Sequence, residues 1–243
     1  NNNIVANGAG QNVLVTGTTD LGGNVTTNEG NVTFASATTL SGAARTIDTG
    51  AVGAGNINFN STLDGGQNLT LTAGTGNITF SATVGAVALG DVTINAATNV
   101  TMVAFTAASL NQAVAGTGTF QNNGILTATT GGVTINSLNV DINNNLVAST
   151  AAQAVLVTGT TDLGGDVTTN DGDVTFASAT TLSGAARTIT TGAAGAGNIN
   201  FNSTLTGAQA LNLTAGTGNI TFTGVVGAVR LGAVTVNSGT TVL

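Results

Sequence analysis

Several residue types are absent from this chain of 243 residues, which contains no cysteine, proline, histidine, lysine, tryptophan or tyrosine. Without cysteine and histidine, the usual zinc sites and the nucleophile–histidine pairs of hydrolases are excluded. The lack of proline has the opposite value, because proline cannot donate the N–H that an interior position of a β-sheet requires. These absences exclude most familiar catalytic centres and leave a chain suited to strands.

Charge is also scarce, with ten acidic residues, three arginines and a net charge of −7. Nucleic-acid binding needs clustered basic residues beside aromatic platforms, and neither is present, so we expect no nucleic-acid partner. Attachment to a membrane surface through a basic amphipathic face is excluded for the same reason. No apolar run approaches the roughly 20 residues of a membrane span, so we expect no membrane insertion.

The chain does contain a long internal repeat. The segment Val13–Gly23 returns letter for letter as Val155–Gly165, a shift of 142 residues, and the shift holds to the end of the sequence. From that point 70 of 89 paired positions are identical. We therefore divide the chain into repeat unit 1 (1–142) and a partial repeat unit 2 (143–243), expected to form one continuous solenoid.

A shorter motif, Gly-Asn-(Val/Ile)-polar-Phe, recurs inside each unit. Its alternation of apolar and polar residues is typical of a strand with one buried face. The phenylalanines that mark it are spaced 25, 21 and 25 residues apart in unit 1, and unit 2 repeats the set. They are Phe34, Phe59, Phe80 and Phe105, then Phe176, Phe201 and Phe222.

This spacing predicts an all-β fold, a right-handed parallel β-helix (β-solenoid) with about 20–25 residues per coil. About ten coils would give a rod on the order of 45–50 Å long. We expect the seven phenylalanines to form a structural core column inside the rod. The one place where the pattern allows a short helical turn is Ala104–Gln112.

Asparagines occupy matching places at the start of the short motif. Identical side chains at equivalent turns of successive coils can form hydrogen-bonded ladders, and asparagine tolerates the left-handed conformation of tight turns. We therefore predict a turn ladder made of Asn31, Asn56, Asn77, Asn198 and Asn219.

The densest group of acids is Asp162, Asp166, Asp171 and Asp173. Glycine-bent loops rich in oxygen atoms can hold calcium, so these residues are a weak calcium candidate. In unit 1 two of the four become amides, at Asn24 and Asn31, which a metal site should not tolerate. We expect solvated turn acids, no catalytic or cofactor-binding residues and no cofactor.

The coil motif and the long identical repeats give the chain a resemblance to the filamentous-haemagglutinin-like, large repetitive surface adhesins of Gram-negative bacteria. The resemblance covers nearly the whole chain, but it rests on solenoid style rather than on a diagnostic motif. It implies an exported, rod-like protein located extracellularly at the cell surface. No functional residue is carried over, since the shared motif is the coil itself.

The expected function is therefore structural and non-catalytic: a rigid rod or filament whose partner is itself, by end-to-end or in-chain stacking of coils. The alternative is an adhesive module that contacts host or neighbouring cells, or a matrix, through side loops. The segment Phe105–Leu138 has the weakest coil pattern and would carry those loops. A third alternative is a β-helix carbohydrate-active enzyme that uses the acids of Asp162–Asp173.

Overall fold

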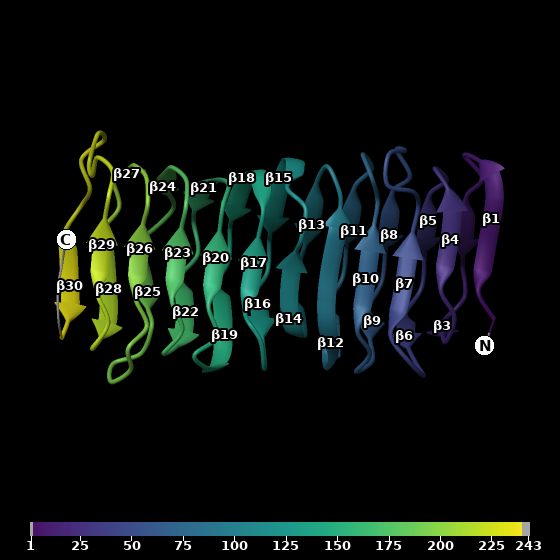
Figure 1. Ribbon diagram of the computed structural model, residues 1–243, viewed down its shortest axis with the longest axis horizontal. Coiled ribbons are helices and arrows are strands. Elements are labelled where there is room, and N and C mark those ends of the chain that lie inside the picture. Colours follow the sequence, from purple (N-terminus) through teal and green to yellow (C-terminus); the bar gives the residue numbers. More distant parts are fainter. Residues whose placement is uncertain (1, 240–243) are drawn as a thin grey trace.

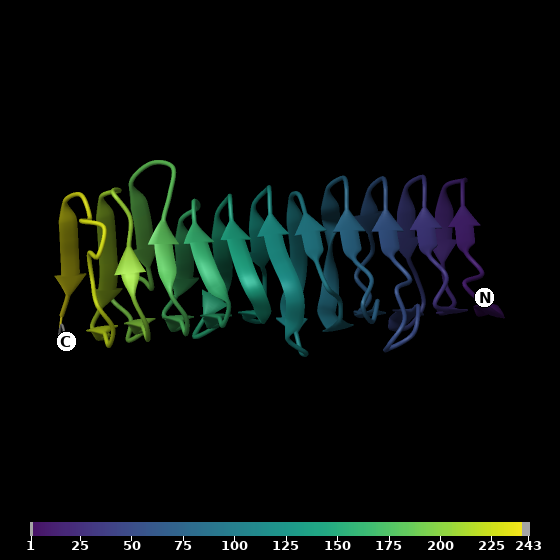
Figure 2. The same ribbon diagram turned by 90° about the horizontal axis from the view of Figure 1, so that it is seen from above.

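The computed structural model describes residues 2–239, which form thirty strands and no helix. Every strand pairing among them is parallel, and the chain winds as a β-solenoid of about 11 turns with ~21 residues per turn. The coils stack side by side into a straight rod with the N-terminal and C-terminal coils at opposite ends (Figures 1 and 2). The parallel solenoid predicted from the repeats is confirmed, while its right-handed winding stays a prediction.

Each coil contributes strands to three ladders, which we call the first, second and third faces in chain order. The first face contains β1 (Ile4–Ala9), β4 (Val25–Asn28), β7 (Arg45–Asp48), β10 (Leu69–Thr72), the second halves of β12 (Val84–Ala96) and β14 (Phe105–Gln112), β17 (Val133–Ile135), β20 (Val155–Val157), β23 (Val174–Phe176), β26 (Ile199–Phe201) and β29 (Ile220–Phe222).

The second face contains β2 (Val13–Val15), β5 (Val32–Phe34), β8 (Ile57–Phe59), β11 (Ile78–Phe80), β13 (Val100–Met102), β15 (Gly116–Asn122), β18 (Ser137–Ile142), β21 (Thr160–Leu163), β24 (Thr180–Leu182) and β27 (Leu205–Thr206). It is a separate 10-stranded sheet.

The third face contains β3 (Thr19–Leu21), β6 (Thr38–Leu40), β9 (Leu63–Asp64), the first halves of β12 and β14, β16 (Leu126–Ala128), β19 (Leu146–Ala151), β22 (Val167–Asn170), β25 (Arg187–Thr190), β28 (Leu211–Gly216) and β30 (Val234–Ser238). The third and first faces join into one 20-stranded sheet because β12 and β14 turn the corner between them without a break.

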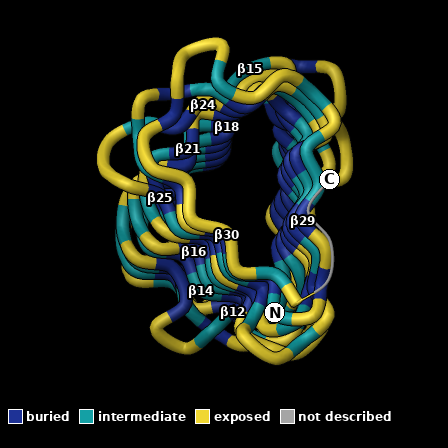
Figure 3. Tube along the Cα trace, turned by 90° about the vertical axis from the view of Figure 1, so that its left-hand side faces the viewer, coloured by how far each residue is buried: buried dark blue, intermediate teal, exposed yellow. Residues whose placement is uncertain are grey.

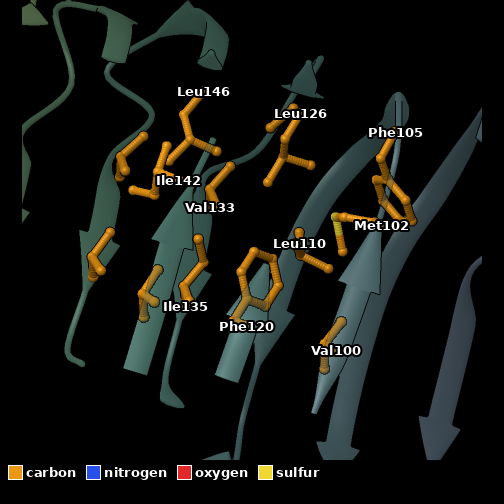
Figure 4. Close-up of a cluster of buried hydrophobic side chains, with 14 of the residues drawn as sticks. Val100, Met102, Phe105, Leu110, Phe120, Leu126, Val133, Ile135, Ile142 and Leu146 are labelled. Atoms are coloured by element: carbon orange, nitrogen blue, oxygen red, sulfur yellow. The ribbon is translucent and has the colours of Figure 1, made fainter. Parts of the chain in front are cut away.

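The core is a continuous apolar column, because the strands of all three faces alternate inward and outward residues. Strands β5, β8 and β11 each have a buried, a half-buried and a buried residue, so their Val or Ile and their Phe point inward. Leucine, isoleucine, valine and phenylalanine from the three faces meet inside the tube, as the close-up in Figure 4 shows for Met102, Leu110 and Phe120. Viewed along the rod, the coils superpose, and loops project only at the corners (Figure 3).

The glycine of the short motif is required by the distance between coils. A Cβ built on Gly30 would lie 1.8 Å from the carbonyl oxygen of Gln11 in the preceding coil, and one on Gly76 would lie 2.3 Å from that of Gly55. Parallel strands about 4.8 Å apart leave no room for a side chain where the corner backbone of one coil sits on the next. The glycine is thus a packing requirement of stacking.

The phenylalanines stack as two columns on two faces. In unit 1, Phe59 lies between Phe34 and Phe80 on the second face, with ring centroids 5.1 and 5.2 Å away. In unit 2 the corresponding stack, Phe176, Phe201 and Phe222, lies on the first face, with centroids 5.3 and 5.5 Å apart.

The prediction that Phe105 continues the first column is wrong. The residue paired with Phe80 in the next coil is Met102, because Phe105 belongs to β14 on the third face. Phe105 only touches Phe80 edge-on across the interior, at 5.3 Å and 73°. Equal spacing along the sequence misled the prediction, since it does not reveal which face a strand occupies.

The helical turn allowed at Ala104–Gln112 is also absent, because Phe105–Gln112 is strand β14. Its buried residues are Phe105, Ala107, Leu110 and Gln112. The three-residue step from Ala107 to Leu110 imitates a helical period, but it marks the corner where the strand passes from the third face to the first.

Truncation of the central ring in each column should cost about the same stability. Phe59→Ala and Phe201→Ala each remove a fully buried ring and should lower the free energy of unfolding by about 3–5 kcal/mol. The two values should agree because each ring lies between two stacked rings, although on different faces. Urea unfolding followed by circular dichroism tests this. Phe222→Ala, which truncates a partly buried ring, is the control that should cost less.

Candidate functional site

The four acids of the calcium candidate do not come together. Asp162 lies on β21 of the second face, and Asp166 follows it at the corner before β22. Asp171 and Asp173 lie at the next corner, between β22 and β23. Among residues 2–239 no group of three or more His, Cys, Asp or Glu side chains could hold a metal ion.

Two of these aspartates instead accept hydrogen bonds from backbone amides of the following coil. Asp166 Oδ1 accepts the N–H of Thr188 at 2.9 Å, and Asp173 Oδ1 accepts the N–H of Asn198 at 2.7 Å. Asn198 also donates its Nδ2 to the same oxygen of Asp173 at 3.0 Å. Their role in the fold is that of ladder rungs.

The predicted asparagines occupy such rungs. Asn31 Oδ1 accepts the N–H of Asn56 at 2.7 Å, and Asn56 Oδ1 accepts that of Asn77 at 2.8 Å. The line begins with Asn12 and continues through Asn99 to Thr119, so it is longer than the prediction. Asn198 Oδ1 likewise accepts the N–H of Asn219 at 2.9 Å in unit 2, at a different corner of the rod.

The rungs explain why aspartate can replace asparagine between the units. Each rung needs one side-chain oxygen that accepts the N–H of the next coil, and a carboxylate provides it as well as an amide does. Asn24 and Asp166 are the same position in the two units, and both accept an N–H, at 3.0 and 2.9 Å. The acids therefore carry charge at positions whose structural work is done by either residue.

The arginine that recurs in both units is held by carbonyl groups. Arg45 Nε donates to the Ala43 carbonyl at 2.8 Å, and its Nη1 donates to Gly22. Arg187 makes the same two bonds, to Ala185 and Gly164, and its Nη1 also lies 3.8 Å from Asp166 Oδ1. The ion pair exists only in unit 2, because unit 1 has Asn24 at that place.

Two amides lie inside the core of one coil, which the sequence did not reveal. Gln112 Nε2 donates to Ser137 Oγ at 2.9 Å, and Asn122 Nδ2 donates to the Asn144 carbonyl at 2.9 Å. Both side chains are fully buried and both bonds reach the next coil. Asn122 Oδ1 has no partner, which carries a desolvation cost of about 1–3 kcal/mol. Their inward direction follows from strand register alone.

A pair of carboxylates faces outward on the second face. Asp141 of β18 pairs directly with Asp162 of β21 in the next coil. Burial, and secondly the charge of Asp162, raise the pKa of Asp141. The pair borders a shallow polar groove of ≈ 440 Å³ that runs across four coils and includes Thr101, Gln121 and Asp141.

A second groove, of ≈ 450 Å³, lies at the corner between the first and second faces. Its lining is mostly hydroxyl groups and small residues, with Leu138 as the exposed apolar side chain. The lining residues are Ala115, Gly116, Thr117, Ser137, Leu138, Thr158, Gly159, Thr160 and Ser178.

The segment Phe105–Leu138 does not carry the longest loops, so that prediction is wrong. It consists of β14 to β17 and the start of β18, joined by short turns. Within the repeated part, the longest connection is the corner loop at residues 49–56, with its counterpart at 191–198. Its base is closed by Thr49 Oγ1, which donates to the Gly55 carbonyl at 2.7 Å, and Thr191 Oγ1 repeats this bond to Gly197 at 2.6 Å.

The C-terminal end of the rod exposes residues of core type. The segment Val84–Ala96 is one strand when a coil lies on each side of it, and Val84 and Val92 are 0% exposed. Its counterpart 226–238 keeps 9 of the 13 residues but is a strand only over Val234–Ser238. There Val226 and Val234 are 44% and 46% exposed. The two segments differ mainly in whether a further coil covers them.

The comparisons add no relative to this picture. No protein-family model, no curated protein and no solved structure matches the chain. No helix of residues 2–239 is long and apolar enough to cross a membrane. The solenoid thus rests on the strand pairing, and the resemblance to bacterial adhesins stays a hypothesis.

Exchange of one rung residue should transfer the ion pair between units. Asn24→Asp should stabilise the chain by up to about 1 kcal/mol, because it places a carboxylate beside Arg45 while keeping the acceptor for Thr46. Asp166→Asn should lose a similar amount. Thermal unfolding at low and high salt is the measurement, and both effects should shrink in salt. Asn111→Asp, an exposed carboxylate on the first face, is the control for added charge; an equal gain there would contradict the pairing.

The Asp141–Asp162 pair should make stability depend on pH. Because the folded-state pKa of Asp141 is raised, the native state binds its proton more tightly, and stability rises as pH falls through that raised pKa. It levels off below the pKa of the unfolded chain. Asp141→Asn should therefore be more stable than the parent at neutral pH and lose this pH-dependent contribution, as unfolding at pH 7 to 3 would reveal.

Asp162→Asn should give a smaller gain at neutral pH, because the neighbouring charge is the lesser cause of the shift in the Asp141 pKa. A parent chain that loses stability steadily between pH 6 and 4, with Asp141→Asn unchanged from it, would contradict this account.

Proposed function

We propose that the chain is a structural segment of an extracellular rod or filament whose partner is another copy of the same coil, in the same chain or end to end. The observation that carries the proposal is the open coil end. Val226 and Val234 are largely exposed, while Val84 and Val92, at the same positions in unit 1, are fully buried under the following coil.

The physical reason is that a coil of a parallel solenoid buries its apolar side only against its neighbours. Strand β30 also presents one unpaired edge, which natural proteins normally cover. Covering the exposed parts of Val226, Val234 and Val236 with a further coil would remove apolar surface from water, at a gain of roughly 25 cal/mol per Å². A following coil is therefore the ligand that best fits this end.

The interior supports the same proposal. Described side-chain chemistry is directed into coil-to-coil contacts: the Asn ladders, the arginine–carbonyl bonds and the phenylalanine stacks all join successive coils. The proposal includes no catalysis, since the acids are dispersed over faces and corners. Placement at a bacterial cell surface rests on the resemblance to the repetitive adhesins and is part of this hypothesis.

The adhesive alternative has one observation in its favour, the groove at the corner of the first and second faces. Its hydroxyl-rich lining would suit a polar ligand of a cell surface or matrix. Leu138→Arg would fill the groove, and unchanged cell or glycan binding by that variant would argue against this alternative.

The open end can be tested by charge. Val234→Lys and Val236→Lys place an ammonium group at inward positions of the last strand and should abolish concentration-dependent end-to-end association, measured by sedimentation velocity and electron microscopy. Val52→Lys is the matched control, because Val52 is 83% exposed in the corner loop and should leave association unchanged.

In-chain stacking needs a second measurement. Extension of the chain by a copy of residues 102–142 should slow amide hydrogen exchange in residues 226–233 to the level seen in 84–91. A parent chain that stays monomeric at all concentrations, together with no gain in protection on extension, would contradict the proposal.

A further inference from the structure

The 142-residue unit does not contain a whole number of coils. Strand β1 lies on the first face, and its counterpart 142 residues later, β19, lies on the third. Eighteen labelled strands separate the two starts, and β12 and β14 each count twice because they cross a corner, so the unit spans twenty strand positions. At three positions per coil, twenty positions are six coils and two-thirds.

The same displacement appears wherever the units can be compared. Strand β5 of the second face corresponds to β23 of the first, and β9 of the third corresponds to β27 of the second. Each counterpart lies one face back in the same sense. Unit 2 is therefore unit 1 moved along the rod and turned by one face, which is a screw operation.

Side-chain contacts survive this rotation unchanged. Arg45 and Arg187 bond equivalent carbonyls on different faces, and Thr49 and Thr191 close equivalent loops at different corners. This is possible because the surroundings of a strand are set by the coils before and after it and not by the face it occupies. The three faces are interchangeable for this sequence.

The corner loop makes the rotation visible. Residues 49–56 leave the rod between the first and second faces, and residues 191–198 leave it between the third and first. In Figure 1 the loop that joins β7 to β8 projects at the upper edge, whereas the loop that joins β25 to β26 projects at the lower edge, and Figure 2 also places the two on different sides.

We infer that the unit is a screw element that presents one surface, marked by the corner loop, on the three sides of the rod in turn. Each unit advances the rod by about 32 Å, and the same side returns after three units, about 96 Å. Partners that recognise the unit would then surround the rod. A flat partner lying along one face would meet the same surface only at every third unit.

The inference uses the proposed function only in assuming several units in a row, because the rotation itself is present within this one chain. Two doubly spin-labelled variants test it at low concentration, where association plays no part. Val52→Cys with Ala194→Cys joins the two corner loops, which are six and two-thirds coils apart. Val52→Cys with Asn202→Cys joins positions at the same corner, seven coils apart.

Without rotation, the first pair would be the closer one, since its axial separation is shorter by a third of a coil. We expect the reverse, a distance for Val52–Ala194 clearly longer than that for Val52–Asn202 in pulsed electron spin resonance, because the first pair is also separated across the rod. An equal or shorter Val52–Ala194 distance would overturn the inference while leaving the open-end experiments unaffected.

An array of four units extends the test to the display itself. With one gold-labelled cysteine at the position of Val52 in each unit, the first and fourth labels should lie on one side of the rod and the middle two on the other sides. Labels aligned along a single side would overturn the inference.

Discussion

The structure depends on the contact between one coil and the next. A single coil of about 21 residues has no core of its own; its inward Val, Ile and Phe are buried only when strands lie on both sides. The segment that is a continuous strand at Val84–Ala96 and only partly a strand at 226–238 shows this dependence in nearly the same sequence. Everything else, including the glycines at the corners and the rungs of asparagine, serves this contact.

The stacking contact also explains why so little chemistry is fixed on the surface. An inward position must be apolar and a corner glycine must lack a side chain, but an outward position is free as long as it carries a small polar group. Thr, Asn, Asp and Gln alternate there without a consistent pattern, as in the outward row of Thr101, Gln121 and Asp141. A rod with variable walls and an invariant interior is a reasonable outcome of selection for length.

Much of the fold could be predicted from the sequence, because period-2 alternation, a coil-sized period and turn residues all agree. The asparagine rungs were predictable for the same reason, since equal residues recurred at equal places. The position of Phe105 could not be predicted, because linear spacing does not reveal the face of a strand. Nor could the buried amides Gln112 and Asn122 or the partial coil in the unit, which become apparent only when strand register is known.

The rung positions have one consequence for the behaviour of the rod in solution. Because an acceptor oxygen is all that a rung requires, a carboxylate and an amide are interchangeable at Asn24 and Asp166 without a change in the backbone. Net charge can therefore drift along the length of such a molecule while its shape stays constant. Mutual repulsion between parallel rods, and with it their tendency to remain dispersed or to bundle, becomes a property that single-atom exchanges can adjust.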